Sequence, residues 1–452
     1  MSFLCKGVEM PKKGKSGKSG KSGKSGKSGK SAKKDDSVDE LFDFLESTAN
    51  MFAYASKEDM DVTDDLEKWK TVWGSPHRDG RFPIGVSKHP LVTKRFIEAG
   101  FGPQINEMDQ HGDTMIFRLL TQHMNDKGAD MECYRLVAPY VDMMKRGRNQ
   151  LLPIHFIRHP LAFDALVMPA FPDPETRRAY VREVDANRRT PLHMACEDYI
   201  HMNSFKLRQL ENYRTTLVSW SMENAFENEA KSNAILADYN KRFHQLASSP
   251  ACPPAYFQQL IDEGADVNAP NENGTTPLLS LLYSMNSQDG ATEAPEHTQQ
   301  TYVPALRSIK DVVDILLRAG ADPYQPDRKG ETPYAYLQWC KGEAITYRRT
   351  LGRSIYYQNL CVMVDEVYAM FRRCHYCHTT EAPTKLCSGC ERVWYCSAEH
   401  QKADWPAHKA FCRAHPVSGA SASASTAKNK NKNKNKKNQT KKNGGRRSFL
   451  SG

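Results

Sequence analysis

The sequence predicts a mainly α-helical protein in which a solenoid of repeated helix pairs is followed by a small metal-bound module. Three observations support this fold class. Short signals of the form Thr-Pro-Leu and Gly-Ala-Asp recur through the middle of the chain, six cysteines and two histidines stand at paired spacings near its end, and both ends are rich in lysine. With 452 residues, of which 39% are hydrophobic, the chain has room for two or three domains with real cores.

The two ends of the chain carry its positive charge. Residues 1–34 contain eleven lysines and one glutamate, and residues 416–452 contain eight lysines, two arginines and no acid. Each end is therefore +10, and because the whole chain is also +10, residues 35–415 carry about −10. The Gly-Lys-Ser and Lys-Asn repeats cannot bury apolar surface, so we expect a disordered arm over 1–37 and a disordered tail over 413–452. They could contact nucleic acid or anionic lipid, or act as solubilising tails.

Residues 38–84 are predicted to form an acidic helical capping segment. Acidic residues alternate there with apolar ones such as Leu41, Phe42, Leu45 and Phe52, which fits a short amphipathic helix. We expect this helix to cover the first end of the solenoid. An acidic helix that binds a partner is the alternative.

The middle of the chain repeats one order of signals. Residues 190–196 read TPLHMAC, residues 264–279 read GADVNAPNENGTTPLL, and residues 312–334 read VVDILLRAGADPYQPDRKGETPY. Thr caps a first helix that Pro opens, and Gly-Ala-Asp ends a second helix before a hairpin-like turn. These segments resemble ankyrin repeats, and weaker copies at 89–117 and 149–156 extend the predicted array over 85–350.

The spacing of the repeats predicts two insertions. Equivalent positions are Thr114, Leu152, Thr190, Thr276 and Thr332, separated by 38, 38, 86 and 56 residues. An ideal ankyrin unit has about 33 residues. We therefore expect a helical insertion near 197–250 and a loop insertion near 285–308, which could emerge on a binding face or, for the helical one, lengthen a stacked unit. Residues 351–373 are predicted to be a linker helix that closes the array.

Two histidines, His155 and His193, belong to the repeat signature. The resemblance implies that each bonds the neighbouring turn, so a structural role is favoured over metal binding or acid–base chemistry.

Near the carboxyl end, cysteine and histidine spacing predicts two four-ligand zinc sites. The pattern is C-x2-C, nine residues, C-x2-C, five residues, C-x3-H, seven residues and H-x3-C. Its members are Cys374, Cys377, Cys387, Cys390, Cys396, His400, His408 and Cys412. So short a segment needs bound metal to fold, and two Zn2+ ions match its eight ligands. Free core cysteines or disulfides are the alternative, which the four paired spacings disfavour.

Residues 374–412 resemble the MYND-type zinc finger, on the segments CHYC, KLCSGC, VWYCSAEHQKADW and PAHKAFC. The resemblance implies interleaved ligation, with Cys374, Cys377, Cys396 and His400 on one ion and Cys387, Cys390, His408 and Cys412 on the other. Spacing alone leaves sequential pairing open. His400 stands where the family usually has Cys, and Cys3His is an ordinary zinc set. Three nearby histidines could be alternative ligands, but they do not fit the paired spacing and are therefore less favoured. They are His375, His378 and His415.

MYND fingers bind short proline-containing peptides, and the matching positions here are Gln401 and Trp405, with Ser388 a weaker match. An indole offers a flat apolar face to a proline ring, and a glutamine amide can bond an extended peptide backbone. A core role for Trp405 is the other interpretation. Both predicted zinc sites are closed, which is typical of structural rather than catalytic zinc.

The sequence therefore predicts a non-enzymatic protein–protein adaptor. We find no H-E-x-x-H, G-x-S-x-G or G-x-G-x-x-G motif. One alternative is a nucleic-acid-associated regulatory factor that uses the basic tails, and another is a protein lysine methyltransferase, an enzyme class in which MYND fingers also occur. We expect no membrane span and no secretory signal, and an intracellular location, cytoplasmic, nuclear or both.

Overall fold

The computed structural model describes residues 36–46, 66–87, 89–122, 128–203, 250–286, 303–350, 355–380, 384–414 and 416. The chain divides into two compact units. The first extends to Arg373 and includes residues 378–383, and the second consists of residues 374–377 with the chain from Thr384 onward.

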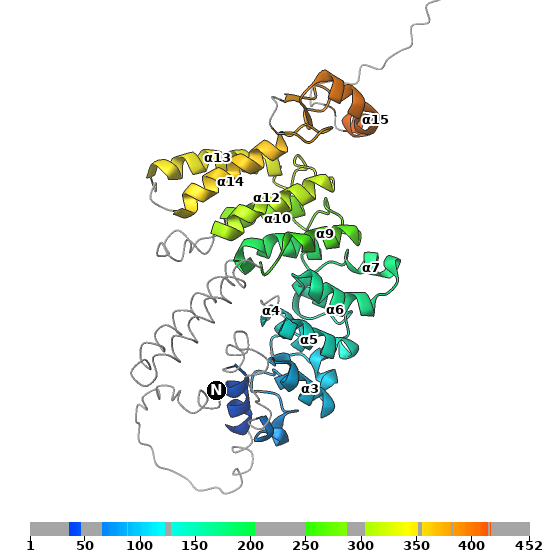
Figure 1. Ribbon diagram of the computed structural model, residues 1–452, viewed down its shortest axis with the longest axis vertical. Helices are drawn as coiled ribbons and strands as arrows, with labels where there is room; N and C mark the ends of the chain where they lie inside the picture. Colours follow the sequence, from blue (N-terminus) through cyan, green and yellow to red (C-terminus); the bar gives the residue numbers. More distant parts are fainter. Residues whose placement is uncertain are drawn as a thin grey trace, which may run out of the picture. The chain divides into compact units, whose positions relative to one another are not determined.

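The first unit is a stack of helix pairs, each with a first and a second helix (Figure 1). The first helices are η3 (Pro83–Gly85), α4 (Met115–Gln122), η7 (Pro153–Phe156), residues 191–203, α10 (Pro277–Asn286) and α13 (Pro333–Thr350). The second helices are α3 (Pro90–Glu98), α5 (Gly128–Val137), α6 (Pro160–Ala170), α9 (Pro254–Asp262), α12 (Val303–Arg318) and α14 (Ile355–Phe371). Each second helix contacts the next one along the chain, so they form a continuous layer.

Short elements complete the first unit. They are a helix over residues 36–46, η2 (Lys70–Val72), η4 (Gly102–Asn106), η5 (Ala138–Tyr140), η6 (Arg148–Gln150) and α7 (Pro174–Tyr180). Helix α7 follows the second helix α6 and precedes the next first helix, so it lies outside the helix pairs.

Local sequence explains where the helices begin. Proline occupies the first helical position of α3, α6, α7 and α9, where a missing N–H costs nothing. His89 and His159 precede two of these prolines, and each imidazole Nδ1 accepts the backbone N–H two residues on, at 3.2 Å. The repeated His-Pro-Leu tripeptide is therefore a capping signal for a second helix.

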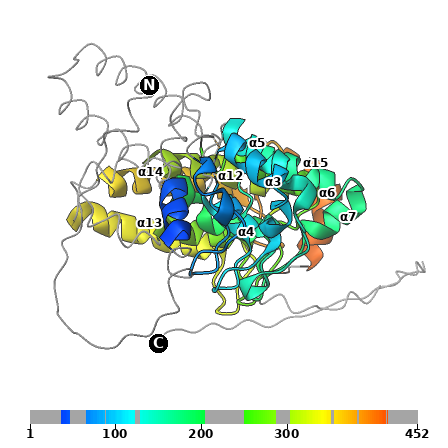
Figure 2. The ribbon, with the colours of Figure 1, turned by 90° about the horizontal axis from the view of Figure 1, so that it is seen from below.

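The loops between successive pairs are joined by backbone hydrogen bonds. Figure 2, a view turned by 90°, shows connecting loops gathered on one side of the helices. The bonds run from Gln110 N to Asp79 O, Arg148 N to Gly112 O, Ala186 N to Asn149 O, Glu272 N to Asn187 O and Arg328 N to Asn273 O, all at 2.8–2.9 Å. This ladder fixes the register of six consecutive loops, even where insertions separate them in sequence.

Four of these loops share one internal geometry. Each begins with Asp109, Asp185, Asn271 or Asp327, and the first side-chain oxygen of that residue accepts N–H groups two and four residues later. The fourth position has a positive φ, and glycine occupies it in three of the four loops. The exception is Arg188, at φ 59°.

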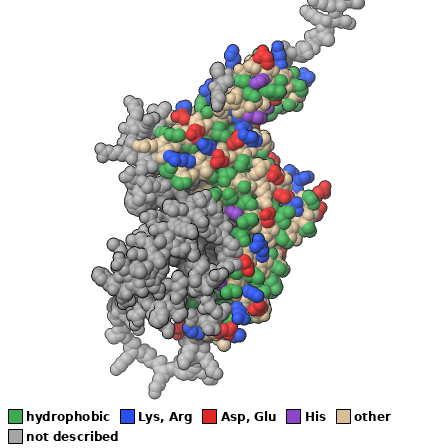
Figure 3. Space-filling model, in the orientation of Figure 1, with side chains coloured by type: hydrophobic (Ala, Val, Ile, Leu, Met, Phe, Trp, Pro, Cys, Tyr) green, Lys and Arg blue, Asp and Glu red, His purple; other side chains and the backbone are tan. Residues whose placement is uncertain are grey.

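One hydrophobic core runs through the first unit. It extends from Val38 to Phe371, and Tyr199, Tyr256 and Phe257 are among its largest fully buried side chains. Helix 36–46 belongs to this core. On the visible described face, basic and acidic side chains are interspersed among apolar ones (Figure 3).

Helix 36–46 packs against the first loop of the array. The Phe42 ring lies 4.9 Å from the His77 imidazole, and Asp39 pairs with Arg78 at 2.7 Å. The expected amphipathic helix is therefore present, and its apolar face is buried against the array. The rest of the predicted capping segment between 47 and 65 lies outside the described residues.

The predicted ankyrin-like solenoid is confirmed, with two corrections. The loop expected near 285–308 is wrong at both ends, because α10 continues to Asn286 and α12 begins at Val303, with Leu306 and Ile309 buried. The linker helix expected over 351–373 is α14, the second helix of the last pair, which packs on α12 and α13.

Other expected segments lie outside the described residues. They are the arm before residue 36, most of the helical insertion (204–249), residues 287–302 and the tail after 416. The two ends of the helical insertion are described and are held together, since the Asn203 side chain bonds both the N–H and the carbonyl of Cys252, at 2.9 and 3.3 Å.

Candidate metal centre

The second unit is built on a two-stranded hairpin and one helix. Strands β1 (Lys385–Leu386) and β2 (Trp394–Tyr395) are antiparallel, and helix α15 (Ala398–Ala414) follows β2. The segment at Cys374 forms a parallel bridge with Trp394, and His375 N donates to the Trp394 carbonyl at 2.7 Å. Three pieces of chain that carry cysteines therefore meet at β2.

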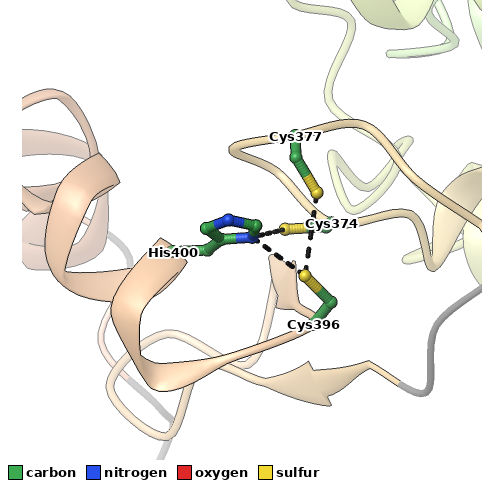
Figure 4. Close-up of side chains that lie close together, drawn as sticks. All are labelled: Cys374, Cys377, Cys396 and His400. Carbon is green, nitrogen blue, oxygen red and sulfur yellow. Dashed lines mark hydrogen bonds between the residues drawn. The ribbon is translucent and has the colours of Figure 1, made fainter.

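The first cluster contains Cys374, Cys377, Cys396 and His400 (Figure 4). Their ligand atoms all lie within 4.8 Å of one another. Cys377 Sγ is 3.7 Å from Cys396 Sγ, and His400 Nδ1 is 3.8 Å from Cys374 Sγ and 2.9 Å from Cys396 Sγ. Cys374 is buried, whereas Cys377 is exposed and the other two are half-buried.

The second cluster contains Cys387, Cys390, His408 and Cys412, all of them buried. Cys387 Sγ is 3.9 Å from Cys412 Sγ, and Cys390 Sγ is 3.6 Å from His408 Nε2. The four atoms again lie within 4.8 Å of one another. The structure thus groups the eight side chains in the interleaved order that the family resemblance implied.

Both clusters fit a tetrahedral zinc ion. Zn–S bonds of about 2.3 Å place two sulfurs of a tetrahedron about 3.8 Å apart, close to the 3.7 and 3.9 Å separations found here. Gly389 is needed beside the second cluster, because a Cβ at that position would lie 2.8 Å from Cys412 Sγ. These two Cys3His clusters fit the two zinc sites of a MYND finger.

The backbone prepares one thiol of each Cys-x2-Cys pair for ionisation. Burial opposes ionisation of Cys374, but backbone N–H groups, led by that of Cys377, lower the pKa of its thiol to about 6. Burial likewise opposes ionisation of Cys387, yet the N–H of Gly389 contributes to a lowered pKa. Burial raises the pKa of Cys390 to about 12, and the charge of Cys387 adds to this rise. A cation is therefore what allows all three thiols of a cluster to ionise together.

A buried carboxylate connects the parts of the finger. Asp404, on α15, accepts a hydrogen bond from the Tyr395 hydroxyl at 2.5 Å and lies 2.8 Å from His375 Nδ1. Each partner is adjacent in sequence to a cysteine of the first cluster. Asp404 was not predicted from the sequence, because it is one of several charged residues in a polar helix and no motif distinguishes it. His375, a low-ranked rival ligand, instead bonds this carboxylate.

The start of α15 is also fixed by a side chain. Ser397 is the N-cap residue of α15, because its Oγ accepts a hydrogen bond from the backbone N–H of His400, three residues later, at 3.2 Å. This cap sets the direction in which His400 leaves the helix. The tripeptide Cys-Ser-Ala before an acidic residue is the sequence signal for it.

The predicted peptide-binding residues lie in different settings. Trp405 is 41% exposed on α15, with its ring centroid 6.0 Å from that of His408, which favours a surface role over a core role. Gln401 is half-buried, and its Nε2 donates to Cys387 Sγ at 3.7 Å. Ser388 is exposed within the 387–390 turn.

Comparison with known proteins agrees with this geometry. Residues 374–412 match the family model described as the MYND finger. A stretch of 81 residues is 32% identical to SET domain and MYND-type zinc finger protein 6 of Schizosaccharomyces pombe, and covers 18% of this chain and 17% of that protein. A stretch of 46 residues is 41% identical to human N-lysine methyltransferase SMYD2, and covers 10% of this chain and 11% of that protein.

The similarity to these curated relatives is confined to the finger region. Among solved structures, the ankyrin repeat domain of Bcl-3 aligns with a TM-score of 0.33 and 15% identity, covering 66% of this chain and 92% of that domain. The ankyrin assignment depends on the helix pairs and the loop ladder, and the finger assignment depends on the family match and the two clusters.

In the part of the chain that the structure describes, no helix is both long enough and apolar enough to cross a bilayer.

Proposed function

We propose that this protein is a non-catalytic adaptor in which the ankyrin array binds one protein and the MYND finger captures a proline-containing peptide from another. Both modules are interaction modules, and the curated similarity does not extend beyond the finger. The single observation that carries the proposal is the exposed indole of Trp405 on a helix whose other face holds ligand candidates of a closed cluster.

In the finger, zinc has a structural role. We assign Cys374, Cys377, Cys396 and His400 to one ion and Cys387, Cys390, His408 and Cys412 to the other. Four protein ligands at each ion leave no position for substrate or water, so the metal holds the hairpin and α15 in place. The binding surface is then made by Trp405, which stacks on a proline ring, and Gln401, which bonds the peptide backbone, with Ser388 at its edge.

In the array, aromatic side chains offer a surface for a folded partner. Trp339 on α13 is 51% exposed, and its ring centroid lies 5.6 Å from that of Tyr336, which is 4.7 Å from that of Tyr283 on α10. Tryptophan and tyrosine are enriched in protein interfaces, where they supply large contact areas at low entropic cost.

The test is peptide capture by Trp405 variants of the full chain. We expect Trp405→Ala to weaken binding of a fluorescent proline-containing peptide by about 1–3 kcal/mol, as for an aromatic anchor, while both zinc equivalents stay bound. Trp339→Ala, which removes an exposed indole from the other unit, is the matched control and should leave this binding unchanged. Loss of zinc from Trp405→Ala would assign the residue to the core of the finger instead.

Two other functions have specific support and separate tests. The +10 charge of each tail favours a nucleic-acid-associated factor, and binding of RNA or DNA with a steep salt dependence that vanishes on deletion of 1–34 and 416–452 would support it. The similarity to a lysine methyltransferase raises that enzyme class. Calorimetry with a methyl-donor cofactor that shows no heat would exclude it.

An intracellular location, cytoplasmic or nuclear, fits the cysteine chemistry. All cysteines within the described residues are free thiols, and thiolate zinc ligands persist in reducing compartments. Imaging of the tagged full chain tests this location.

A further inference from the structure

Helix α15 has two chemically different faces. Its buried face carries Asp404, His408 and Cys412, which follow one another at four-residue spacing. Its exposed face carries Lys402, Lys409 and Arg413, at spacings of seven and four that also align on one side of a helix. We call these three residues the α15 basic stripe. In Figure 3, basic side chains lie at the outer margin of the finger, with acidic side chains among them.

Trp405 stands at the border between the two faces. It is four residues before Lys409 and three after Lys402, so both cations are its neighbours on the helix surface. Pro406, also exposed, lies between them and adds no polar group that could compete for a ligand. A peptide that stacks on the indole must therefore pass close to the basic stripe.

The charge of the stripe is not neutralised within the described part of the chain. No carboxylate there lies within ion-pair distance of Lys402, Lys409 or Arg413, and Glu399 precedes Lys402 by one helical turn. The Glu399 carboxylate lies in the first turn of α15. In sequence the stripe is followed by 416–452, which add eight lysines, two arginines and no acid.

We infer that the peptide captured by the finger is acidic: aspartate or glutamate residues flank its proline on the side that faces Lys409 and Arg413. This inference rests on the proposed function of the finger and names the class of peptide that the finger selects. Carboxylates next to the stacked proline meet the unpaired cations, whereas lysine or arginine there is repelled, so the stripe selects by attraction and by repulsion.

The size of the effect follows from the exposure of these groups. Ion pairs at a solvated surface contribute little each, so two or three of them together favour an acidic over a neutral flank by about tenfold in Kd at low salt. The preference should shrink as salt is raised, because exposed charges are screened.

The experiment measures fluorescence anisotropy of the zinc-loaded full chain with three peptides. They share one proline-containing core and differ in flanks of Asp/Glu, Asn/Gln or Lys. We expect the acidic peptide to bind about tenfold more tightly than the neutral one, and the lysine peptide to bind most weakly. Trp405→Ala should weaken all three, because the indole contacts the shared proline.

Charge reversal locates the preference on the protein. In Lys409→Glu/Arg413→Glu the acidic preference should disappear and the lysine peptide should gain affinity. Arg328→Glu/Lys329→Glu is the matched control, since it reverses two exposed cations in a loop of the array and changes the net charge equally. The control should keep the acidic preference, which separates a local effect from general attraction by the basic tails.

Each remaining outcome has a defined meaning. If none of the three peptides binds, the proposed function of the finger fails and this inference fails with it. If acidic and neutral peptides bind equally through Trp405, the proposed function stands and the inference is wrong. If the acidic preference survives in Lys409→Glu/Arg413→Glu, the tails cause it and the inference is wrong. If a single-stranded oligonucleotide binds through Lys409 and Arg413 without Trp405, the stripe is a nucleic-acid contact and the inference is again wrong.

Discussion

His193 Nε2 lies 3.0 Å from the carbonyl oxygen of Thr275, although 82 residues separate the two in sequence. The other ring nitrogen, Nδ1, accepts the backbone N–H of Thr190 at 3.2 Å. The imidazole is fully buried, so it is a neutral side chain that links the fourth and fifth helix pairs by hydrogen bonds. His155 holds the same position one pair earlier, and its Nδ1 accepts the Leu152 N–H at 3.1 Å.

The two buried histidines predict acid sensitivity of the array. Burial is the main cause that lowers the pKa of both His155 and His193 to about 4, from an ordinary 6.5. Between pH 6.5 and about 4, these two histidines become protonated in the unfolded chain but stay neutral in the folded chain. The free energy of unfolding should therefore fall as pH falls through this window, by up to about 3 kcal/mol per histidine. Urea unfolding followed by circular dichroism at several pH values measures the slope.

A comparison of variants separates this effect from acid release of zinc. His155→Gln/His193→Gln removes both titrating groups, so its unfolding free energy should depend less on pH between 6.5 and 4 than that of the parent. His111→Gln changes an exposed imidazole and should keep the parent slope. Equal slopes in all three proteins would contradict a role for the buried pair.

The loop at Arg188 predicts a stabilising substitution. Arg188 adopts φ 59° at a position where three equivalent loops have glycine, and a side chain makes the left-handed conformation costly. Arg188→Gly should therefore raise the free energy of unfolding by about 0.5–1 kcal/mol. Urea unfolding at neutral pH measures the change.

The reverse change at an equivalent loop gives the matching control. Gly274 has φ 79°, and a Cβ there would lie 2.9 Å from the backbone nitrogen of Arg328 in the next loop. Gly274→Ala should destabilise the array by about 1–3 kcal/mol through strain and the disturbed ladder bond. A destabilised Arg188→Gly would show that the arginine side chain contributes more than its backbone costs.

The array could be predicted from sequence to the extent that its signals are local. Thr190, Thr276 and Thr332 open first helices where the spacing placed them, because Thr-Pro caps and Gly-Ala-Asp stops act within a few residues. Assigning residues 355–371 to a linker missed the second helix of the last pair, because no loop signature follows it. The inter-loop bonds could not be foreseen, since they join backbones that 31 to 85 residues separate.

The metal centre was predicted more completely than the network that supports it. Residue type and pair spacing identified the eight candidate zinc ligands, and the family resemblance implied how they divide into the two clusters. The Asp404 contacts depend on how three segments of chain meet at β2. The identity of the residues does not predict this arrangement. The hydrogen bonding of His193 was predicted in part. The repeat resemblance implied that its side chain bonds the neighbouring turn, and only the structure identifies Thr275 as the partner.

Removal of the Asp404 carboxylate should weaken the finger. Asp404→Ala leaves the buried Tyr395 hydroxyl without its acceptor, which costs about 1–3 kcal/mol, and it also removes the hydrogen-bond partner of the exposed His375. We expect lower zinc affinity, measured by competition with a chromogenic chelator. Tyr395→Phe removes one partner of the same network, so the effects of Asp404→Ala and Tyr395→Phe should be less than additive in the double variant. Full additivity would show that the two groups act separately.

The different burial of the two clusters predicts stepwise loss of zinc. Cys377 is exposed and two other members of its cluster are half-buried, whereas all four members of the other cluster are buried. A chelator should therefore remove one equivalent quickly and the second slowly. Cys377→Ser should abolish the fast phase, and Cys390→Ser should abolish the slow one. Cys361→Ser, a half-buried cysteine of α14, should keep both phases.

The same kinetics decide how the ligands are shared. With interleaved sites, Cys377 and Cys390 serve different ions, so their two variants must lose different phases. With sequential sites, the first four cysteines would hold one ion, and both variants would lose the same phase. Interleaving also ties both halves of α15 to the rest of the finger. One site takes His400 from the first turn of the helix, and the other takes His408 and Cys412 from its later turns. Loss of either ion should then loosen α15 as a whole, and with it the surface around Trp405.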